Sequence, residues 1–357
     1  MATRNKGEWT EIYSFFKIIK DKKLTLADKN LDVLNYNNYF NVTKVSTLNI
    51  EELCHLVSSD RVIVENKSTG TKKEIQISNI INDDILCGLV SKIKKGKGAF
   101  QISEFDSIQG HFGLNIIHGG NSNQKSDIVL DIDNNDFKKE NEGFGIKSEL
   151  GGSPTLLNAS LQTNFIYEIE SFSVEHLGVV NSIETRTKLK DRISKIQELG
   201  GSFKFIDIES STLRYNFSVV DSIIPELISK MLLCYFMKRT SSINSNLKNL
   251  YDSGDLSNFA IEDLQSFTAK IKRLLVAVLL GFFPGIRWDG KFDAKGLIVV
   301  KENGDQVGFH CVDISVLEDY LFEKIKFDTP STTKHRFGKI YESDGKTYFK
   351  LNLQLRM

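Results

Sequence analysis

The chain has 357 residues, of which 40% are hydrophobic and 26% are charged, and these ordinary values exclude a largely disordered protein. Lys and Arg together number 46, and so do Asp and Glu, so the formal net charge is zero. A neutral total argues against a uniformly basic nucleic-acid-binding protein and leaves a local basic groove as the way to bind phosphates.

The sequence also argues against export and membrane insertion. Residues 1–11 lack the apolar core of a signal peptide. The longest apolar stretch, 274–286, is too short to span a bilayer and is predicted to be a buried helix that Pro284 ends. None of the four cysteines is spaced from another like metal ligands or a redox pair. We therefore expect a soluble cytoplasmic protein without a membrane partner.

The first third of the chain is predicted to begin with a helix over residues 8–20. Its apolar side chains follow helical spacing along one face: Trp9, Ile12, Phe15, Phe16 and Ile19. Residues 47–100 are typical of short mixed elements, and they close on a lysine-rich turn, KIKKGKG, at 92–98.

The middle of the chain predicts two neighbouring strands. Residues 126–133 (SDIVLDID) alternate between apolar and polar side chains, and residues 144–150 (FGIKSEL) form a second strand. The polar segment 134–143 between them is predicted to be a turn. A short polar connection of this kind favours an antiparallel hairpin.

The remaining elements follow from caps and turn signals. We expect helices over 184–199, stopped by Gly200-Gly201, then over 222–238, 260–280 and 313–324, with a strand over 202–208. The dipeptides Asn303-Gly304 and Asp344-Gly345 indicate hairpin turns. The predicted fold class is α/β, with a mixed central sheet flanked by helices and an additional helical and β-hairpin C-terminal region.

Three regions are expected along the chain. Residues 1–100 form an N-terminal helical and mixed region that contributes the first core helix, 101–221 form the catalytic core, and 222–357 form a region for DNA recognition or dimer contacts.

Asp127 and Lys147 are the residues of this hairpin that suit phosphodiester hydrolysis. Such a reaction needs charge neutralised on the phosphate, an activated water and a stabilised leaving oxygen, which carboxylate-bound magnesium ions can supply. A nearby lysine orients the water or stabilises the developing charge. Both side chains lie on the polar faces of their strands. By itself this pattern is more often a solvated surface.

The same residues resemble a degenerate PD-(D/E)XK nuclease signature, written here as Ser126-Asp127 and then Gly145-Ile146-Lys147. Four stretches, taken in order along nearly the whole chain, resemble the HpaII-type type II restriction endonucleases: 6–19, 125–165, 288–300 and 329–356. The resemblance implies a restriction-endonuclease-like fold and magnesium-dependent cleavage of a short palindromic duplex, with CCGG as the family's target.

One departure from the signature is Gly145, which stands where the family motif has a metal-binding acid. Another carboxylate must then complete the site. We favour Glu8 or Glu11, one turn apart on the first helix, with Glu149 close behind. Asp131 and Asp133 lie farther along the Asp127 strand. For each acid the alternative is an exposed surface carboxylate. The metal-ligand candidates are thus Asp127, Glu8, Glu11 and Glu149.

Three segments are candidates for DNA contact. The basic run with Lys94, Lys95 and Lys97 suits phosphates, or is a solvated loop. Asn158 and Asn164 suit adenine or phosphate, although their segment also suits helix capping. The loop after Pro330 suits groove or phosphate contacts, or is an exposed turn; its candidates are Ser331, Thr332, Lys334, His335 and Arg336.

The predicted function is therefore a type II site-specific deoxyribonuclease with Mg²⁺ as cofactor. A palindromic target favours a homodimer on double-stranded DNA, with a cognate DNA methyltransferase encoded separately. No P-loop or dinucleotide fingerprint is present, so we expect no use of ATP. The alternatives are a sequence-specific DNA-binding protein that has lost catalysis, and a nuclease of the same fold that acts on branched or damaged DNA.

Overall fold

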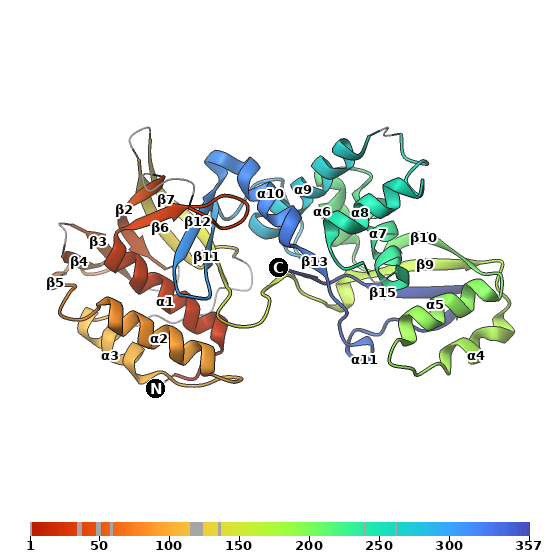
Figure 1. Cartoon of the computed structure of the whole chain (residues 1–357), viewed down its shortest axis with the longest axis horizontal. Helices are drawn as coiled ribbons and strands as arrows, with labels where there is room; N and C mark the ends of the chain where they lie inside the picture. Colours follow the sequence, from red (N-terminus) through yellow and green to blue (C-terminus); the bar gives the residue numbers. More distant parts are fainter. Residues whose placement is uncertain are drawn as a thin grey trace. The chain divides into compact units, whose positions relative to one another are not determined.

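The computed structural model describes residues 2–33, 38–47, 51–57, 60–114, 124–134, 137–238, 240–260 and 263–357. The chain folds into two compact units, whose elements are labelled in Figure 1. Unit 1 contains Met1–Pro154 and Phe292–Tyr320, and unit 2 contains Thr155–Lys291 and Leu321–Met357. This division rests on packing. The functional roles expected for 1–100, 101–221 and 222–357 stay a prediction.

Unit 1 is built around a mixed sheet with the strand order β1-β12-β11-β7-β6-β2-β3-β4-β5. Strand β1 also pairs with β2, so the strands from β1 to β2 in this order form a closed ring of pairings. The strands are β1 (Lys23–Leu26), β2 (Tyr39–Ser46), β3 (Glu52–Leu56), β4 (Arg61–Asn66), β5 (Lys72–Gln76), β6 (Ile128–Asp133), β7 (Lys138–Ser148), β11 (Gly296–Val300) and β12 (Gln306–His310). The helices are α1 (Lys6–Asp21), α2 (Asp83–Lys95) and α3 (Ser103–Phe112), with a short 3₁₀ turn at Cys311–Asp313.

The expected hairpin is confirmed, because β6 and β7 are antiparallel neighbours. The turn expected over 134–143 is wrong in extent, since β7 already begins at Lys138. The pairing shifts register near Asp131, and Asn141 adopts a positive φ of 59° while its N–H donates to the Asp131 carboxylate at 2.7 Å. This irregularity interrupts the alternation that marks a strand in sequence, so the exposed first half of β7 resembles a loop.

Strand β7 lies between β6 and β11. It runs parallel to β11, with Ile146 opposite Ile298 and Lys147 opposite Val299. Every residue of β11 is buried. The strand that carries Lys147 is therefore held from both sides, which limits how far its backbone can move.

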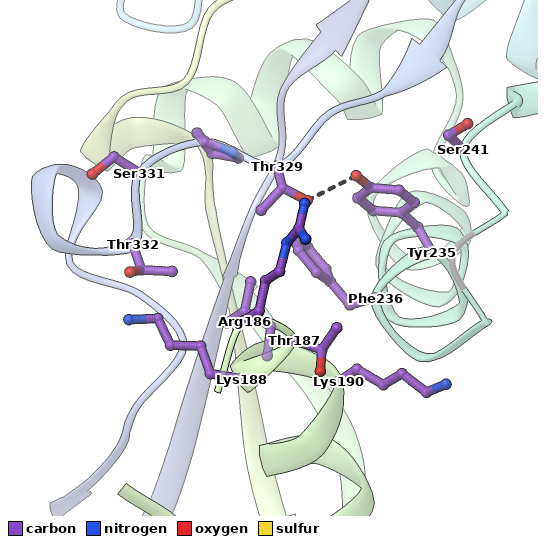
Figure 2. Close-up of a pocket in the computed structure, with 12 residues that line it drawn as sticks. Arg186, Thr187, Lys188, Lys190, Tyr235, Phe236, Ser241, Thr329, Ser331 and Thr332 are labelled. Atoms are coloured by element: carbon purple, nitrogen blue, oxygen red, sulfur yellow. Dashed lines mark hydrogen bonds between the residues drawn. The ribbon is translucent and has the colours of Figure 1, made fainter. Parts of the chain in front are cut away.

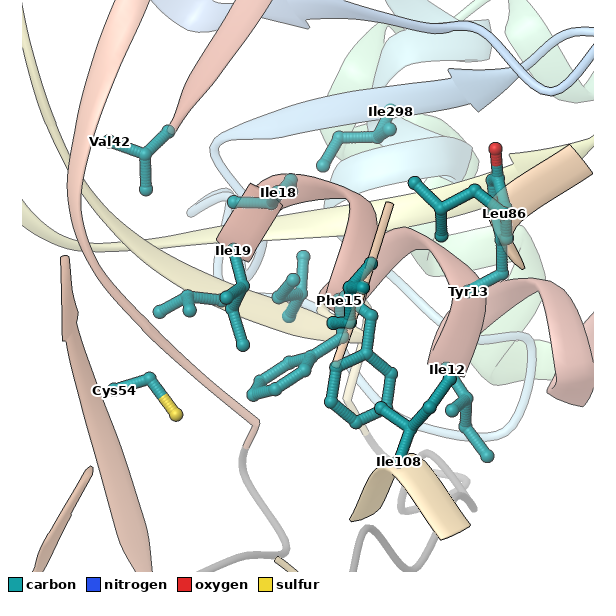
Figure 3. Close-up of a cluster of buried hydrophobic side chains, with 14 of the residues drawn as sticks. Ile12, Tyr13, Phe15, Ile18, Ile19, Val42, Cys54, Leu86, Ile108 and Ile298 are labelled. Carbon is teal, nitrogen blue, oxygen red and sulfur yellow. The ribbon is translucent and has the colours of Figure 1, made fainter. Parts of the chain in front are cut away.

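Helix α1 confirms the helix expected near the N-terminus and covers this part of the sheet. It begins at Lys6 because Asn5 and Glu8 form a reciprocal capping box. Its apolar side chains pack into one buried cluster with residues of the sheet and of α2 and α3 (Figure 3). On the side of β7, the hydroxyls of Thr10 and Ser148 are 2.9 Å apart. Carboxylates on the adjacent turns of α1 are thereby brought toward the end of β7.

The lysine-rich turn expected over 92–98 is wrong for its first half. Residues Lys92–Lys95 form the last turn of α2, which ends at Gly96. Buried Ile93 anchors this turn, and cations at a helix C-terminus are favoured by the helix dipole.

Unit 2 holds two smaller sheets, with strand orders β10-β9-β15-β14 and β13-β16-β8. The strands are β8 (Thr155–Leu157), β9 (Asn164–Glu170), β10 (Ser202–Ile208), β13 (Lys326–Phe327), β14 (Ile340–Ser343), β15 (Lys346–Asn352) and β16 (Leu355–Arg356). The helices are α4 (Leu177–Asn181), α5 (Lys188–Glu198), α6 (Ser211–Val220), α7 (Ile224–Lys238), α8 (Ile243–Asp252), α9 (Leu264–Leu280) and α11 (Thr332–His335), with 3₁₀ turns at Leu161–Thr163 and Val174–His176. Helix α10 (Ile314–Lys324) begins in unit 1 and ends in unit 2.

Several later predictions are confirmed. Both hairpin turns are present, between β11 and β12 and between β14 and β15, and Asp344 and Gly345 take the positive φ values that such a turn needs. Helix α9 ends at Leu280, as expected for the helix over 260–280, and Gly281 is its C-cap, so the helix stops before Pro284 rather than at it. Among the residues described, no helix combines the length and apolar character that crossing a membrane requires.

Candidate active site

Asp127 and Lys147 are brought together by the β6–β7 pairing. Asp127 directly precedes β6, and its backbone N–H donates to the Phe144 carbonyl at 2.8 Å. Its carboxylate Oδ2 accepts a hydrogen bond from the backbone N–H of Ile146 at 2.7 Å. The carboxylate is thus fixed against β7 one residue before Lys147.

Half-burial makes both charges costly. Burial raises the pKa of Asp127, against the opposing effects of the Ile146 N–H and the Lys147 charge. Burial lowers the pKa of Lys147, while Asp127 and Glu11 oppose this change. The two groups therefore interact at short range in a partly dry environment, which is the setting in which charged groups act strongly on a substrate.

Glu11 is the carboxylate of α1 that faces this pair. Its pKa is raised to about 8, first by burial and then by the charges of Asp127 and Glu8, while Lys147 and Arg4 lower it. The charges of Asp127 and Lys147 both act on this carboxyl group, so Glu11 interacts electrostatically with both. This arrangement supports the expectation that the first helix supplies the missing acid.

Glu8 and Glu149 are less well placed than Glu11. Glu8 Oε2 already accepts the backbone N–H of Asn5 at 2.7 Å, and the Glu8 N–H donates to the Asn5 side chain. Glu149 follows the last residue of β7, and its charge acts on the pKa of Tyr320. Glu8 therefore caps its helix, and the charge of Glu149 acts on Tyr320 of α10. Both stay candidates with weaker support.

The acids farther along β6 have other partners. Asp131 forms an ion pair with Lys44 at 2.7 Å, and Asp133 accepts a hydrogen bond from Asn41 at 3.0 Å. These contacts link β2, β6 and β7, so Asp131 and Asp133 have a structural role that requires no part in catalysis.

The structure gives a physical reason for Gly145. A Cβ atom built at this position would lie 3.0 Å from the Lys125 carbonyl oxygen and 4.0 Å from Asp127 Oδ2. The first contact is tighter than ordinary van der Waals packing. A side chain here would require the Lys125 carbonyl to shift by a few tenths of an ångström, so glycine fits this position without strain. Glu11 of α1 is the candidate to replace the carboxylate that is missing at position 145.

Two cations near the site were missed by the sequence reasoning. Lys125 has its pKa lowered to about 8 by burial and by the Lys147 charge, against the charge of Asp293. Arg4 is buried with its guanidinium 5.0 Å from the Trp9 ring centroid, and burial lowers its pKa against the charges of Asp106, Glu8 and Glu11. Lys125 could have been found, because it lies two residues before Asp127. For Arg4 no signal exists in the sequence.

The carboxylates of Asp127 and Glu11 are the candidate ligands for a divalent metal. In the described ranges, no three His, Cys, Asp or Glu side chains group into a ready-made metal cage. Mg²⁺ does not require one, because it keeps several waters and is held by one or two carboxylates together with substrate phosphates. Asp127 and Glu11, whose charges repel each other in a half-buried cleft, fit that mode of binding.

The lysines expected to contact DNA in unit 1 are exposed around the end of α2. Lys94 Nζ donates to the Glu302 carbonyl at 3.2 Å, so this side chain is partly engaged. Lys95 and Lys97 lie exposed on either side of Gly96. Phosphate contact by these lysines stays a prediction.

The loop after Pro330 places its candidates in different environments. Ser331 caps α11 and accepts the Lys334 N–H at 3.3 Å, and Thr332 begins the helix half-buried. Lys334 and Arg336 are exposed, as is Asn158 in its separate segment. His335 is only 9% exposed, so its side chain packs mostly inside the loop, and its contact with DNA stays a prediction with weaker support.

Asn164 has still weaker support as a DNA-contacting residue. It is 1% exposed, donates to the His335 carbonyl at 3.0 Å and accepts from Asn352 Nδ2 at 2.7 Å. Both hydrogen bonds of its side-chain amide link β9 to other elements, one to β15 and one to α11. A polar side chain in a Ser/Thr/Asn-rich segment looks like a surface residue in sequence, and only its neighbours show that it is buried.

We expect Asn164→Ala to lower stability without changing the choice of DNA sequence. Removing a buried amide leaves its partners unsatisfied, which costs about 1–3 kcal/mol. Thermal unfolding measures the loss, and exposed Asn158→Ala provides the control. A stable Asn164→Ala protein with altered sequence preference would contradict the structural role.

Similarity to known proteins covers nearly the whole chain, including the residues of the candidate site. A sequence model of the family described as HpaII restriction endonuclease matches residues 5–357. The type II restriction enzyme HpaII of Haemophilus parainfluenzae is 31% identical over 360 aligned positions, which cover 99% of this chain and 98% of that enzyme. No solved structure matches.

Proposed function

The chain belongs to the HpaII restriction endonuclease family, and on this premise we propose that it cleaves both strands of the palindrome CCGG by magnesium-dependent hydrolysis. The family match and the related type II restriction enzyme support a site-specific deoxyribonuclease. The observation that carries the assignment to particular residues is the half-buried group of Asp127, Glu11 and Lys147, in which each charge acts on the others.

In this proposal Asp127 and Glu11 hold the metal and Lys147 serves the water. A bound magnesium ion would neutralise phosphate charge and make the attacking water more acidic. The Ile146 N–H keeps Asp127 oriented through its bond to Oδ2. Lys147 Nζ, next to both carboxylates, would hydrogen-bond the attacking water or a phosphate oxygen and stabilise the developing charge.

The other parts of the proposal follow from the palindromic target. Two identical half-sites favour a homodimer, in which each protomer cuts one strand. A separately encoded methyltransferase would protect the host's own sites. We further propose that the mixed sheet and helices of unit 1 form a restriction-endonuclease-like core.

Digestion of a plasmid of known sequence tests this function. With Mg²⁺ present we expect discrete fragments, and sequencing of the cut ends should place every cut at CCGG. Chelation by EDTA should stop the reaction. Uniform degradation, or no cleavage with any divalent metal, would contradict the proposal.

A DNA-binding titration and a digest of forked duplexes separate the two alternatives. Binding without cleavage would identify a protein that has lost catalysis. The tight approach of Lys125 to Gly145 is a steric reason for this glycine that needs no such loss, and it favours an active enzyme. Faster cleavage of forked than of intact duplexes would identify a nuclease for branched DNA.

A further inference from the structure

Unit 2 carries a basic surface, whereas the residues assigned to catalysis belong to unit 1. Two cavities of about 520 Å³ each adjoin one another, because Lys188 and Thr332 line both. One cavity lies at the start of α5 and the other beside α11 and β14. We call this the α5–α11 surface and define its basic residues as Arg186, Lys188, Lys190, Arg336, Lys339 and Lys350.

Most of the positive charge on this surface is not neutralised. Lys188 pairs with Glu184 at 2.7 Å and Lys350 with Glu209 at 2.5 Å. The other four basic side chains have no ion pair with a carboxylate in the part of the chain that is described: Arg186, Lys190, Arg336 and Lys339. All four are exposed. A neutral protein that concentrates exposed cations in one place creates a local site for anions.

The start of α5 adds to this potential. Three basic residues stand at or before its first turn, where the helix dipole disfavours cations. The N-cap residue, Thr187, makes no side-chain capping hydrogen bond and donates instead to Asp191 at 2.9 Å. An anion would relieve both the charge crowding and the uncapped helix start.

Hydroxyl groups line the same cavity as Arg186, Lys188 and Lys190. Figure 2 shows Arg186 extending toward Thr329, whose hydroxyl is 2.8 Å from that of Tyr235. Ser331 and Thr332 lie on the side of Lys188. Arg and Lys side chains, hydroxyls and helix N-termini are the groups that contact DNA phosphates.

We propose that the α5–α11 surface binds the sugar-phosphate backbone of duplex DNA. This inference rests on the proposed function, and it assigns phosphate contact to Arg186 and Lys190 on α5 in addition to the loop after Pro330. Two adjoining cavities with exposed cations on both suit consecutive phosphates of one strand better than a single small anion.

The test is DNA binding by the full chain in EDTA, so that no cleavage occurs. The probes are two 30-base-pair duplexes, one with a single CCGG and one without it, titrated at several salt concentrations. For Arg186→Ala/Lys190→Ala we expect weaker binding of both duplexes and a salt slope smaller by about 2, because each phosphate contact contributes about 0.9. Arg186→Lys/Lys190→Arg should keep the wild-type slope.

The matched control removes two exposed cations of unit 2 that do not line either cavity, Lys248→Ala/Lys324→Ala. It should leave the slope unchanged. An equal loss of DNA affinity in both double variants would show that only net charge matters and would overturn the proposal. A wild-type salt slope in Arg186→Ala/Lys190→Ala would overturn it too. If the wild-type protein binds neither duplex, the proposed function is wrong as well. If Arg186→Ala/Lys190→Ala binds and cleaves DNA like wild type, only the proposed role of the α5–α11 surface is wrong.

Discussion

Replacing Lys147 with alanine is expected to reduce DNA cleavage by about 10²–10⁴-fold, the range typical of a group that assists proton transfer or stabilises charge at the reacting atoms. Lys147 is half-buried and interacts with the charges of Asp127 and Glu11, so no water-exposed cation can take its place without rearrangement. Binding to a CCGG duplex in EDTA should stay within a few-fold of wild type, since the lost group acts on the reaction. Single-turnover cleavage and a binding titration measure the two quantities.

A lysine on the same strand supplies the control. Lys139 lies exposed in the first half of β7, away from Asp127. We expect Lys139→Ala to cut at the wild-type rate. If Lys147→Ala keeps full activity, the assignment of the site to the β6–β7 hairpin is wrong.

The second large effect is expected for Glu11→Gln, which keeps the shape of the side chain and removes its charge. If Glu11 binds the metal, cleavage in Mg²⁺ should fall by about 100-fold or more, because even groups that only support a metal ligand contribute 10–100-fold. Glu149→Gln is the comparison. Loss of cleavage in Glu149→Gln with retention in Glu11→Gln would move the missing carboxylate to the end of β7.

Glu11→Gln should also change how stability depends on pH. The pKa of Glu11 is raised from an ordinary value of 4.5 to about 8, so between these values the folded chain holds a proton that the unfolded chain releases. Stability of the metal-free protein therefore falls as pH rises from about 4.5 to about 8. Glutamine carries no such proton.

Thermal unfolding in EDTA checks this sign. At pH 8.5 we expect Glu11→Gln to melt at a higher temperature than wild type, and at pH 5 the two should melt alike. A variant that is inactive yet more stable would indicate that the carboxylate is kept for function at a cost in stability. An equal difference at both pH values would contradict the raised pKa of Glu11.

The local parts of the fold followed from residue patterns. Helix α1 was predictable because its apolar side chains repeat at helical spacing, and the β14–β15 hairpin because Asp344-Gly345 suits a turn with positive φ. The β6–β7 hairpin was predictable because alternation needs no information beyond the strand itself. Where a register shift at Asn141 broke the alternation, the boundary of β7 was missed.

Burial by distant elements could not be predicted in the same way. Asn164 and His335 lie in polar segments that resemble surface loops, yet both are buried. Asn164 bonds to the His335 carbonyl and to Asn352, which are both more than a hundred positions away in the chain. Composition describes a segment, and burial depends on what packs over it. For this reason only some of the predicted contact residues in the loop after Pro330 are exposed, among them Lys334 and Arg336.

The sequence alone determined that Asp127 and Lys147 stand on two paired strands and that the chain resembles one nuclease family from end to end. It left open which carboxylate replaces the acid at position 145. The tertiary structure favours Glu11 for our proposal, because packing α1 against β7 brings its charge within reach of Asp127 and Lys147 across more than a hundred residues of chain. It also supplied the reason for Gly145, a close approach of the Lys125 carbonyl that exists only once β6 and β7 are paired.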